Sequence, residues 1–499
     1  FGVTGEDATA TANGQVTVKG GTFGVINSYD DQFTMRGGIS DTDDDHSVDV
    51  TVEADARYAF VAGQDVEVGN LTFEEGAGYT MVSLDSNVLV DAYNGITAKG
   101  SVTADNVEGI ENAVARPDYA FFDTTLEVDG NTLTAYLSRN EEAPMSYAAS
   151  DSERAVAAAM MAGTDSAFFA TMVDSTKDQM KSTLASLGND LHLAAQNATL
   201  VNSVTLARTI KDQASAFGQA RTATLDNGAQ IWVTGIGQWG SVDAGGASVD
   251  MDVDFYAGFV GGEMAYGDRN KVGVFFGYGS TDFDASADGK IESDDIHLGI
   301  YGENEWDAVG VTYGLAYTMQ DRDSNRSLSV KDQIAHNAIS YDADVFQVFG
   351  EASYKGFNTD SFQVEPYVGL AYMMVSSDDF TETAAGYSFR TEMEDQNVGV
   401  GTVGVRGAIP FTAGSVEMAV KGDVSYMQFF GDTEATAKMS IGDAGVAQLK
   451  GEELKGMGAV GLGVEAALGK NTKLGVSYTG AFGSDITSHG IGATLRVNF

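Results

Sequence analysis

Hydrophobic residues alternate with small or polar ones along the C-terminal half of the chain, from about residue 227 to residue 499. A period of two is typical of β-strands, because successive side chains of a strand point to opposite faces. Between residues 309 and 319 one face carries larger apolar side chains: Val309, Val311, Tyr313, Leu315, Tyr317 and Met319. Many such segments reach the roughly 9–11 residues that a tilted strand needs to cross a bilayer. The pattern therefore predicts membrane-spanning strands with an apolar side toward lipid and a polar side toward a lumen.

About twelve such segments begin near residues 229, 252, 270, 292, 308, 341, 362, 395, 414, 453, 471 and 487. An even number is typical of bacterial outer-membrane barrels. Tight turns such as Gly469-Lys470-Asn471 alternate with long, acidic and polar stretches at 322–340, 378–394 and 431–452. We expect tight turns on the periplasmic side and long stretches as external loops. The predicted fold class is all-β with a helical linker, in which residues 227–499 form a 12-stranded antiparallel transmembrane β-barrel.

The first 150 residues carry shorter alternating runs, such as Val48-Asp49-Val50-Thr51-Val52. Gly, Asn and Asp separate these runs, which is the pattern of many short strands joined by tight turns. Residues 124–137 are predicted to form a hairpin with Asp129-Gly130-Asn131 in its turn. We therefore assign residues 1–150 to a separate β-rich domain.

Residues 151–226 are rich in Ala, Met, Leu and Gln and predict a helical linker. Ser150 and Glu153 fit a capping box before the first helix. A second helix is predicted from Ser166 to Leu187, and a third from about residue 191 to residue 223.

Composition narrows the chemistry of the protein. The chain has no Cys among its 499 residues, which excludes thiolate metal sites, disulfides and thiol catalysis. A formal net charge of −44 opposes binding to nucleic acid, since phosphate contacts need clustered Lys and Arg. No stretch approaches the 18 or more apolar residues of a membrane helix. The chain starts with neither Met nor a basic and apolar leader, so we expect residue 1 to be an internal or processed position.

The last ten residues form an alternating run that ends on an aromatic residue. Ile491, Ala493, Leu495, Val497 and Phe499 share one face of this predicted strand. The run resembles the C-terminal signal of outer-membrane barrels that the barrel-assembly machinery reads, with Ile491, Leu495, Val497 and Phe499 as its residues.

The order of β-rich segment, helix, twelve strands and terminal Phe resembles the monomeric autotransporters of type Va secretion. The hairpin at 125–139 resembles the last rungs of that family's passenger, and residues 232–240 resemble its opening barrel strand. The resemblance implies that residues 1–150 are the C-terminal part of a β-helical passenger at the cell surface. It also implies a monomeric barrel in the outer membrane, in contact with lipid and lipopolysaccharide. Insertion would depend on the barrel-assembly machinery and periplasmic chaperones.

A twelve-stranded lumen accommodates a helix and leaks when it is empty. We expect residues 194–223 to be both plug and tether, because about 20 helical residues match a roughly 30 Å bilayer. Three cations on this helix are candidate pore residues: Arg208, Lys211 and Arg221. By strand parity seven carboxylates face the lumen as candidate partners: Asp295, Glu303, Glu351, Glu365, Glu417, Asp423 and Glu465. Alternatively, the cations lie in water at the periplasmic mouth, where pairing contributes little.

Other candidate sites are discounted. Asp41, Asp43 and Asp45 open like a calcium loop, but His46 stands where an EF-hand needs Gly, so we expect neither a metal nor a cofactor. The serine-nucleophile motifs GxSxG and GDSG are absent from the sequence, which predicts that the protein is not an enzyme and that its passenger is adhesive or surface-structural. The linker also lacks the Asn-Asn pair at which one autotransporter subgroup is cleaved, so we expect an uncleaved tether.

Two other functions remain open at this point. An outer-membrane porin or channel with a soluble N-terminal domain would need the helical segment to lie outside the lumen. A soluble β-helical enzyme with an appended β-sandwich would also show alternation, although sandwich strands average only about 5–6 residues.

Overall fold

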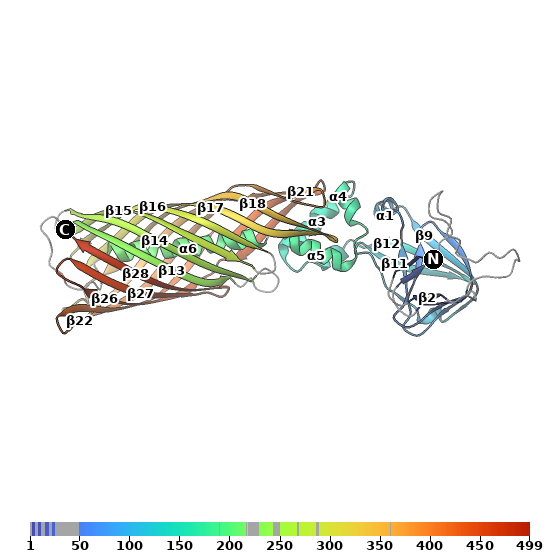
Figure 1. The fold of residues 1–499 in the computed structure, drawn as a ribbon, viewed down its shortest axis with the longest axis horizontal. Coiled ribbons are helices and arrows are strands. Elements are labelled where there is room, and N and C mark those ends of the chain that lie inside the picture. Colours follow the sequence, from blue (N-terminus) through green and yellow to red (C-terminus); the bar gives the residue numbers. More distant parts are fainter. Residues whose placement is uncertain are drawn as a thin grey trace.

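The computed structural model arranges the chain in three parts in a row: a β-domain, a group of helices and a long β-barrel (Figure 1). The structure describes residues 49–188, 190–215, 217, 229–242, 250–266, 269–285, 289–359 and 361–499, together with four short strands between residues 2 and 24. The C-terminus lies at the end of the barrel that is farther from the β-domain (Figure 1).

From β3 to β10, successive strands of the β-domain alternate between two sheets, and strands two apart in the sequence pair in parallel. One sheet contains β2 (Ala8–Ala10), β3 (Gln15–Val18), β5 (Asp49–Val52), β7 (Asp65–Phe73), β9 (Ala98–Glu108), β11 (Phe122–Asp129) and β12 (Thr132–Arg139). The other contains β1 (Gly2–Thr4), β4 (Thr22–Gly24), β6 (Arg57–Val61), β8 (Gly78–Val82) and β10 (Val114–Ala115). Helix α1 (Ser86–Tyr93) and a 3₁₀ turn (Ile110–Asn112) connect strands. This winding is that of a β-helix, and the β11–β12 hairpin covers its C-terminal end.

Between the two sheets, alternate side chains of strands β5, β7 and β9 are buried. Val50, Leu71 and Val102 are wholly buried between them. Gly100 lets β9 approach β6 closely, because a Cβ at this position would lie 2.2 Å from the carbonyl oxygen of Val61. The alternation of residues 49–140 thus supplies a conventional apolar core.

Five helices follow the β-domain: α2 (Ala143–Ser146), α3 (Asp151–Ala162), α4 (Ala167–Met172), α5 (Lys177–Leu187) and α6 (Asp190–Ala214). The single helix predicted from Ser166 to Leu187 is therefore wrong. Thr176 interrupts it by capping α5: its hydroxyl accepts from the Gln179 backbone N–H, and the Gln179 side chain accepts from the Thr176 N–H. The predicted end of α6, residue 223, lies outside the described residues.

The capping box predicted at the start of α3 is half formed. The Ser150 hydroxyl accepts a hydrogen bond from the Glu153 backbone N–H at 3.1 Å. The Glu153 carboxylate, however, accepts from the N–H of Ala149, at 2.7 Å, one residue before the expected position. The helix start is still capped, because both groups satisfy free backbone donors.

Twelve antiparallel strands close into a barrel, which confirms the predicted fold class. In order around the barrel they are β13 (Ala229–Val242), β14 (Met251–Tyr266), β15 (Asn270–Asp284), β16 (Lys290–Trp306), β17 (Val309–Val330), β18 (Gln333–Tyr354), β19 (Gln363–Ser377), β22 (Gln396–Ala413), β23 (Val416–Gly431), β26 (Met457–Ala467), β27 (Thr472–Phe482) and β28 (Ile486–Asn498). Pairing of β13 with β28 closes the cylinder. The largest departure from the predicted starts is at β18, which begins at Gln333 rather than near residue 341.

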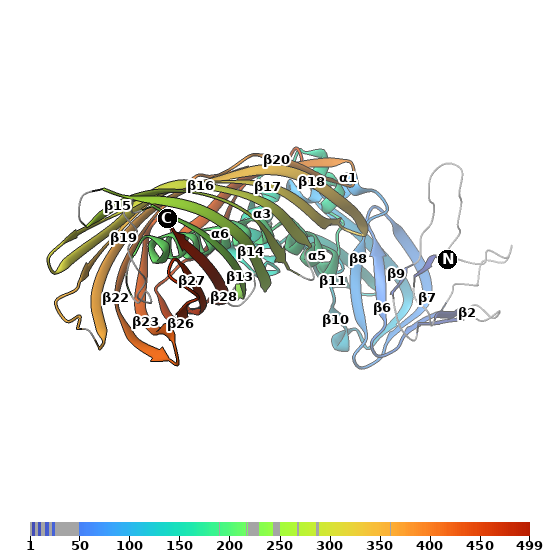
Figure 2. The same cartoon turned by 60° about the vertical axis from the view of Figure 1, so that its left-hand side comes forward.

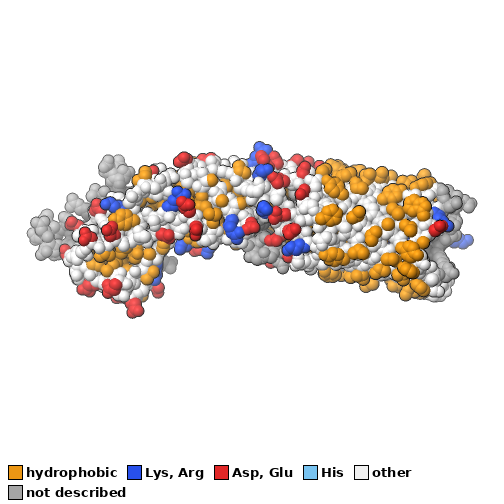
Figure 3. Space-filling view, turned by 180° about the vertical axis from the view of Figure 1, so that it is seen from behind, with side chains coloured by type: hydrophobic (Ala, Val, Ile, Leu, Met, Phe, Trp, Pro, Cys, Tyr) orange, Lys and Arg blue, Asp and Glu red, His pale blue; other side chains and the backbone are white. Residues whose placement is uncertain are grey.

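The alternating rows of the barrel face outward and inward as predicted. Tyr313 and Leu315 are exposed on the outside, whereas Thr312 and Ala316 are buried toward the lumen. Hydrophobic side chains cover much of the outer surface of the barrel toward the end farther from the β-domain, while charged side chains gather on the middle of the molecule (Figure 3). This apolar outer band is the surface that a bilayer requires.

The three stretches predicted as external loops are strands instead. Residues 322–340 continue β17 and β18, and the other two stretches form a four-stranded sheet of β20 (Phe380–Ala384), β21 (Tyr387–Met393), β24 (Glu434–Ile441) and β25 (Gly445–Glu453). Polar composition favours loops, but one face of this sheet is apolar and buried, as in Ala435, Ala437 and Met439 of β24. We call β20, β21, β24, β25 and residues 326–337 the extracellular extension.

Helices α3–α5, here called the linker helices, lie against the extracellular extension (Figure 2). One hydrophobic core runs from the β-domain through these helices into the extension. Two neighbouring side chains of α4 connect the parts: Phe168 packs edge-on against Tyr387 of β21, and Phe169 packs against Tyr93 of the β-domain, with ring centroids 5.0 and 4.9 Å apart. The β-domain is therefore packed against the barrel end through the linker helices rather than joined to it by chain alone.

Candidate functional site: the barrel lumen

Helix α6 lies inside the barrel lumen (Figure 1). It contacts the wall from β13 to β19 and, at the extracellular end, β24 and β25. Its 25 residues span about 37 Å at 1.5 Å per residue, enough to cross a bilayer core. Toward β22–β28 a cavity of about 220 Å³ remains beside the helix. The helix therefore occupies most of the lumen and leans on one side of the wall.

Apolar contacts surround the extracellular half of α6. Leu191, Ala195 and Leu200 are wholly buried and belong to one cluster with inward-facing wall residues such as Phe283 and Val345. Water is excluded from such a contact, because buried apolar surface offers it no hydrogen-bond partners. This half of the helix is therefore packed against the wall without room for water between the buried apolar side chains.

Side-chain amides fix the position of α6 within this apolar region. Gln396 donates to the side-chain oxygen of Asn197 at 3.0 Å, and Asn197 donates to a backbone carbonyl of β25 at 2.6 Å. Gln238 donates to the side-chain oxygen of Asn202 at 2.9 Å. A slip of the helix by one turn would leave these buried groups without partners, which is costly. Together they define one axial position for the helix.

Arg322 of β17 is a further buried contact that the sequence analysis missed. It is wholly buried and donates to the Thr199 hydroxyl of α6 at 2.7 Å and to Gln320 at 2.6 Å. Its guanidinium lies over the rings of Phe283 and Tyr341, 5.7 and 5.9 Å from their centroids. The assignment of residues 322–340 to an external loop concealed its inward orientation.

Ion pairs hold the periplasmic half of α6. Arg208 pairs with Asp423, which also accepts from the Tyr367 hydroxyl at 2.6 Å. Lys211 Nζ lies 3.0 Å from a carboxylate oxygen of Glu351. Two of the three predicted pore cations are thus beside two of the predicted lumen carboxylates.

Arg406 of β22 extends the second pair along the wall. Its guanidinium lies 2.7 Å from Glu351 and 2.8 Å from Glu365. It also lies over the ring of Phe217, at 4.9 Å, just beyond the end of α6. Each carboxylate in this row is therefore within reach of a cation, as buried charges require.

Arg496 of β28 caps the C-terminal end of α6. It donates to the backbone carbonyl of Asp212 and to the side chain of Gln213, each at 3.0 Å, and to Glu465 at 2.7 Å. The last carbonyl groups of a helix have no partner within the helix, and a cation there also favours the helix dipole. The last barrel strand thus holds the end of the linker.

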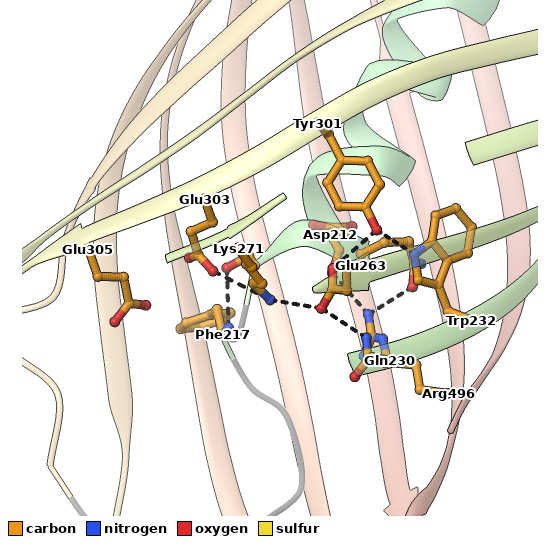
Figure 4. Close-up of polar contacts among 12 residues, drawn as sticks. Asp212, Phe217, Gln230, Trp232, Glu263, Lys271, Tyr301, Glu303, Glu305 and Arg496 are labelled. Carbon is orange, nitrogen blue, oxygen red and sulfur yellow. Dashed lines mark hydrogen bonds and ion pairs between the residues drawn. The ribbon is translucent and has the colours of Figure 1, made fainter. Parts of the chain in front are cut away.

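A second network lies in the wall near the end of α6 (Figure 4). The indole N–H of Trp232 donates to the Tyr301 hydroxyl at 2.7 Å, which donates to Glu263 at 3.1 Å. Lys271 lies 3.3 Å from Glu263 and 3.5 Å from Glu303. These contacts tie β13, β14, β15 and β16 together on the lumen side.

The remaining predicted residues have other surroundings. Asp295 accepts from two hydroxyls and the Gln320 amide rather than from a cation. Glu417 lies beside the β22–β23 turn, at the barrel end, and accepts from the Thr412 hydroxyl at 3.2 Å. Arg221 lies outside the described residues.

The barrel's own cations were absent from the prediction. They include Lys271, Lys355, Arg406, Lys421 and Arg496, each in an ion pair on the lumen side. The parity that located the carboxylates also locates them: Arg496, for example, alternates with Leu495 and Val497 of the outward row. The signal was present in the sequence.

The outward row of the last strand faces lipid. Ile491, Leu495 and Phe499 are exposed on the outside of the barrel, and Val497 is half-buried. The backbone N–H of Phe499 donates to the carbonyl of Ala229 at 2.9 Å, so the chain end pairs with the start of β13.

The described residues offer no cluster of three or more His, Asp or Glu side chains that could hold a metal ion. Asp41, Asp43 and Asp45 lie outside the described part of the chain. Within that part, no helix is both long and apolar enough to cross a membrane.

Comparison with known proteins identifies the barrel. Residues 231–479, about half of the chain, match the family model of the autotransporter β-domain. Solved structures with similar folds include the translocator domain of NalP from Neisseria meningitidis, with a TM-score of 0.48 and 14% identity over 61% of this chain and 98% of that one. The transport unit of AIDA-I from Escherichia coli gives a TM-score of 0.44 and 15% identity over 61% and 98% of the two chains.

Two curated relatives carry the name "Extracellular serine protease" and come from Serratia marcescens. One is 23% identical over 494 residues, which are 89% of this chain and 46% of the relative. The other is 24% identical over 330 residues, which are 65% of this chain and 31% of the relative. The chain spans about half the length, or less, of the curated relatives it matches.

These relatives contradict the prediction that the protein is not an enzyme. That prediction relied on the absence of two serine-nucleophile motifs from 499 residues. Because the chain matches less than half of each relative, the motif search bears only on that part. The family model and the lipid-facing, helix-filled barrel agree, and the chain is therefore an outer-membrane autotransporter with its passenger at the cell surface.

Proposed function

We propose that the barrel exports residues N-terminal to α6 and then keeps them attached, with α6 as an uncleaved tether. The observation that carries this proposal is the set of side chains that hold α6 in one position along the lumen. Arg208 and Lys211 of the helix pair with Asp423 and Glu351 of the wall. From the wall, Arg496 caps the helix end. A segment so fixed is suited to anchoring a passenger.

The partners follow from the same surfaces. The apolar outer row binds outer-membrane lipid and lipopolysaccharide, and the barrel is monomeric. During biogenesis the barrel-assembly machinery and periplasmic chaperones act on it, with the outward row of β28 as their recognition signal. Exchanging Phe499 for Ser would test this role through slower appearance of the heat-modifiable barrel, with unchanged synthesis.

The passenger's activity is proposed from the two curated relatives, which are named extracellular serine proteases. In this proposal residues 49–140 are a β-helical stem that presents a serine protease at the cell surface. The test is casein hydrolysis by cells that express the natural polypeptide, with and without a serine-protease inactivator. Hydrolysis that the inactivator leaves unchanged, or no hydrolysis, would reject the protease.

Protease treatment of intact cells tests export. Added proteinase K is expected to remove residues 49–140 from intact cells and to leave the barrel protected and heat-modifiable. The same treatment of a variant that retains the barrel but starts at residue 229 is the control for barrel integrity. Under the porin alternative, residues 49–140 would be cut only after the outer membrane is permeabilised.

A further inference from the structure

The outer edges of the extracellular extension are β25 and the end of β17, and no described strand pairs with either edge. β25 is an outer strand of the four-stranded sheet, and β17 continues beyond Asn325, its last residue paired with β16. Backbone groups on such an edge need partners, and an uncovered edge invites pairing with another chain. The linker helices lie on both edges: α3 contacts β25, and α5 contacts β17.

The same hydrogen-bonding device occurs at both edges. The Ser152 hydroxyl of α3 donates to the carbonyl of Lys450 at 2.9 Å and accepts from the N–H of the same residue at 3.0 Å. The Ser186 hydroxyl of α5 likewise donates to the carbonyl of Ser329 and accepts from its N–H, each at 2.9 Å. Each serine hydroxyl thus makes the two backbone hydrogen bonds that a neighbouring strand would make to one residue of the edge.

A side-chain amide joins the two sheets of the extension in the same manner. Asn337 of β18 accepts from the N–H of Thr383 in β20 at 2.9 Å and donates to its carbonyl at 3.2 Å. The extension is therefore an open trough from β17 to β25, and the linker helices, which also contact each other, close its open side.

Two contacts at the β24–β25 turn require a close fit between helix and extension. A Cβ at Gly163, which ends α3, would lie 2.1 Å from the carbonyl oxygen of Ala444. The two carboxylate oxygens of Asp443 accept from the backbone N–H groups of Ala167 and Phe168, each at 2.9 Å, at the start of α4. The barrel thus supplies a cap for a helix of the linker.

The linker helices have little stability of their own. They are 12, 6 and 11 residues long, and isolated helices shorter than about 12–15 residues are marginal in water. Their apolar side chains Val156, Met160 and Leu184 are wholly buried in the core that they share with the extension. Helix formation in this segment therefore depends on the surface that the barrel provides.

We propose that the extracellular extension is the acceptor on which residues 151–187 fold when they leave the pore, and that this docking ends export and locks the passenger onto the barrel. The inference rests on the proposed export function, because it requires residues 151–187 to pass through the lumen before they reach the extension. The barrel is thus the folding template for the linker helices.

The first test removes both serine contacts from the full chain, as Ser152→Ala with Ser186→Ala. Trypsin cleavage after Arg154, Lys177 and Lys181 in the purified, detergent-solubilised protein is expected to become about tenfold faster, because local opening becomes easier. The heat-modifiable barrel band should not change. Ser146→Ala with Ser484→Ala, two exposed serines elsewhere, is the matched control and should cleave as the parent does.

The same variants are then followed in cells. In pulse-labelled cells the double variant should expose residues 49–140 to added protease several-fold more slowly than the parent. Parental rates of both cleavage and exposure would overturn the docking inference. If the parent itself never exposes residues 49–140, the proposed export function fails instead.

A cross-link tests the docked arrangement without weakening it. The hydroxyl oxygens of Ser182 in α5 and Ser329 in β17 are 3.3 Å apart, and the chain has no Cys of its own. Ser182→Cys with Ser329→Cys should form a disulfide in most molecules after export, and the cross-linked linker should resist trypsin. A heat-modifiable barrel without this cross-link under oxidising conditions would contradict docking.

Discussion

The β-domain and the barrel use the same alternation of apolar and polar residues with opposite burial. In the β-domain, Val52 and Leu71 are wholly buried between two sheets. In the barrel, Leu370 and Leu462 are 69% and 64% exposed on the outer face, while Arg496 is 4% exposed inside. Alternation therefore determines which residues share a face, and strand length and closure determine which environment that face meets.

Different interactions stabilise the interior of the β-domain and the lumen of the barrel. Apolar burial in the β-domain is non-directional, so side chains of similar volume can replace one another at modest cost. Paired charges and amides in the lumen are directional, and losing one partner leaves the other buried and unpaired. The polar contacts in the lumen therefore specify one position for α6. A purely apolar lumen would fix the position of the helix less strictly.

The largest effect is expected when one partner of an ion pair in the lumen is removed. Arg406→Met removes the cation nearest to Glu365, which is 2% exposed, and should destabilise the barrel by about 3–5 kcal/mol. Urea unfolding in detergent micelles, followed by tryptophan fluorescence, measures this loss in the barrel alone, because all three Trp residues lie in β13 and β16. Adding Glu365→Gln should recover part of the loss; a double variant as unstable as the single one would argue against a stranded charge.

The next prediction compares a charged substitution on the outer face of the barrel with one on the outer face of the β-domain. Leu370→Arg places a cation on the lipid-facing row and should cost about 2–4 kcal/mol near the membrane midplane. Glu67→Arg, on the water-facing row of β7, should change the stability of the β-domain by less than about 0.5 kcal/mol. The loss of unfolding free energy in the barrel variant is measured by urea titration in phospholipid vesicles. The change in the β-domain variant is measured by urea titration followed by circular dichroism. Equal costs would mean that the barrel's outer row does not meet lipid.

The smallest expected effect concerns the junction between the two regions. Hydrogen bonds from the backbone N–H groups of Phe168 and Ala167 lower the pKa of Asp443. A lowered pKa in the folded state means that the stabilisation is complete above about pH 4 and is lost as the pH falls through the lowered value. Asp443 is largely solvent-accessible, so its cap contributes on the order of 0.5–1 kcal/mol.

Hydrogen exchange of the α4 amides measures that contribution between pH 3 and pH 6, after correction for intrinsic rates. Protection in the parent should fall at the acid end of this range. Asp443→Asn should start lower at pH 6 and change less with pH. A parallel fall in both proteins would assign the acid sensitivity to another group.

Sequence patterns predicted the barrel well because each strand repeats one local rule over many residues. They failed where contacts with residues distant in the sequence determined the local structure. Thr176 ends the predicted helix by capping α5, in a stretch where the Ala120 N–H also bonds to the Ser175 carbonyl. Polar composition suggested loops at 431–452, but the alternate residues of β24 are buried by helices that lie more than 200 positions earlier.

In the lumen, parity located carboxylates such as Glu351 and Asp423 without their partners. A carboxylate's partner depends on which strands are neighbours and on the register between them, as for Glu365 of β19 and Arg406 of the neighbouring β22. Neither quantity can be obtained from one strand's sequence. Searching for inward-facing cations by the same parity would have found Arg406 and Arg496, though not which carboxylate each one meets.

Single-channel conductance in planar bilayers tests most directly whether α6 fills the lumen. We predict small or no conductance for the full chain and a much larger, stable conductance for a variant that lacks residues 1–223, because the empty twelve-stranded lumen conducts ions. Arg208→Met with Lys211→Met, which keeps the helix and removes two of its ion pairs, should give intermittent openings between these limits. Equal conductance of the full chain and the helix-free barrel would contradict a helix-filled lumen.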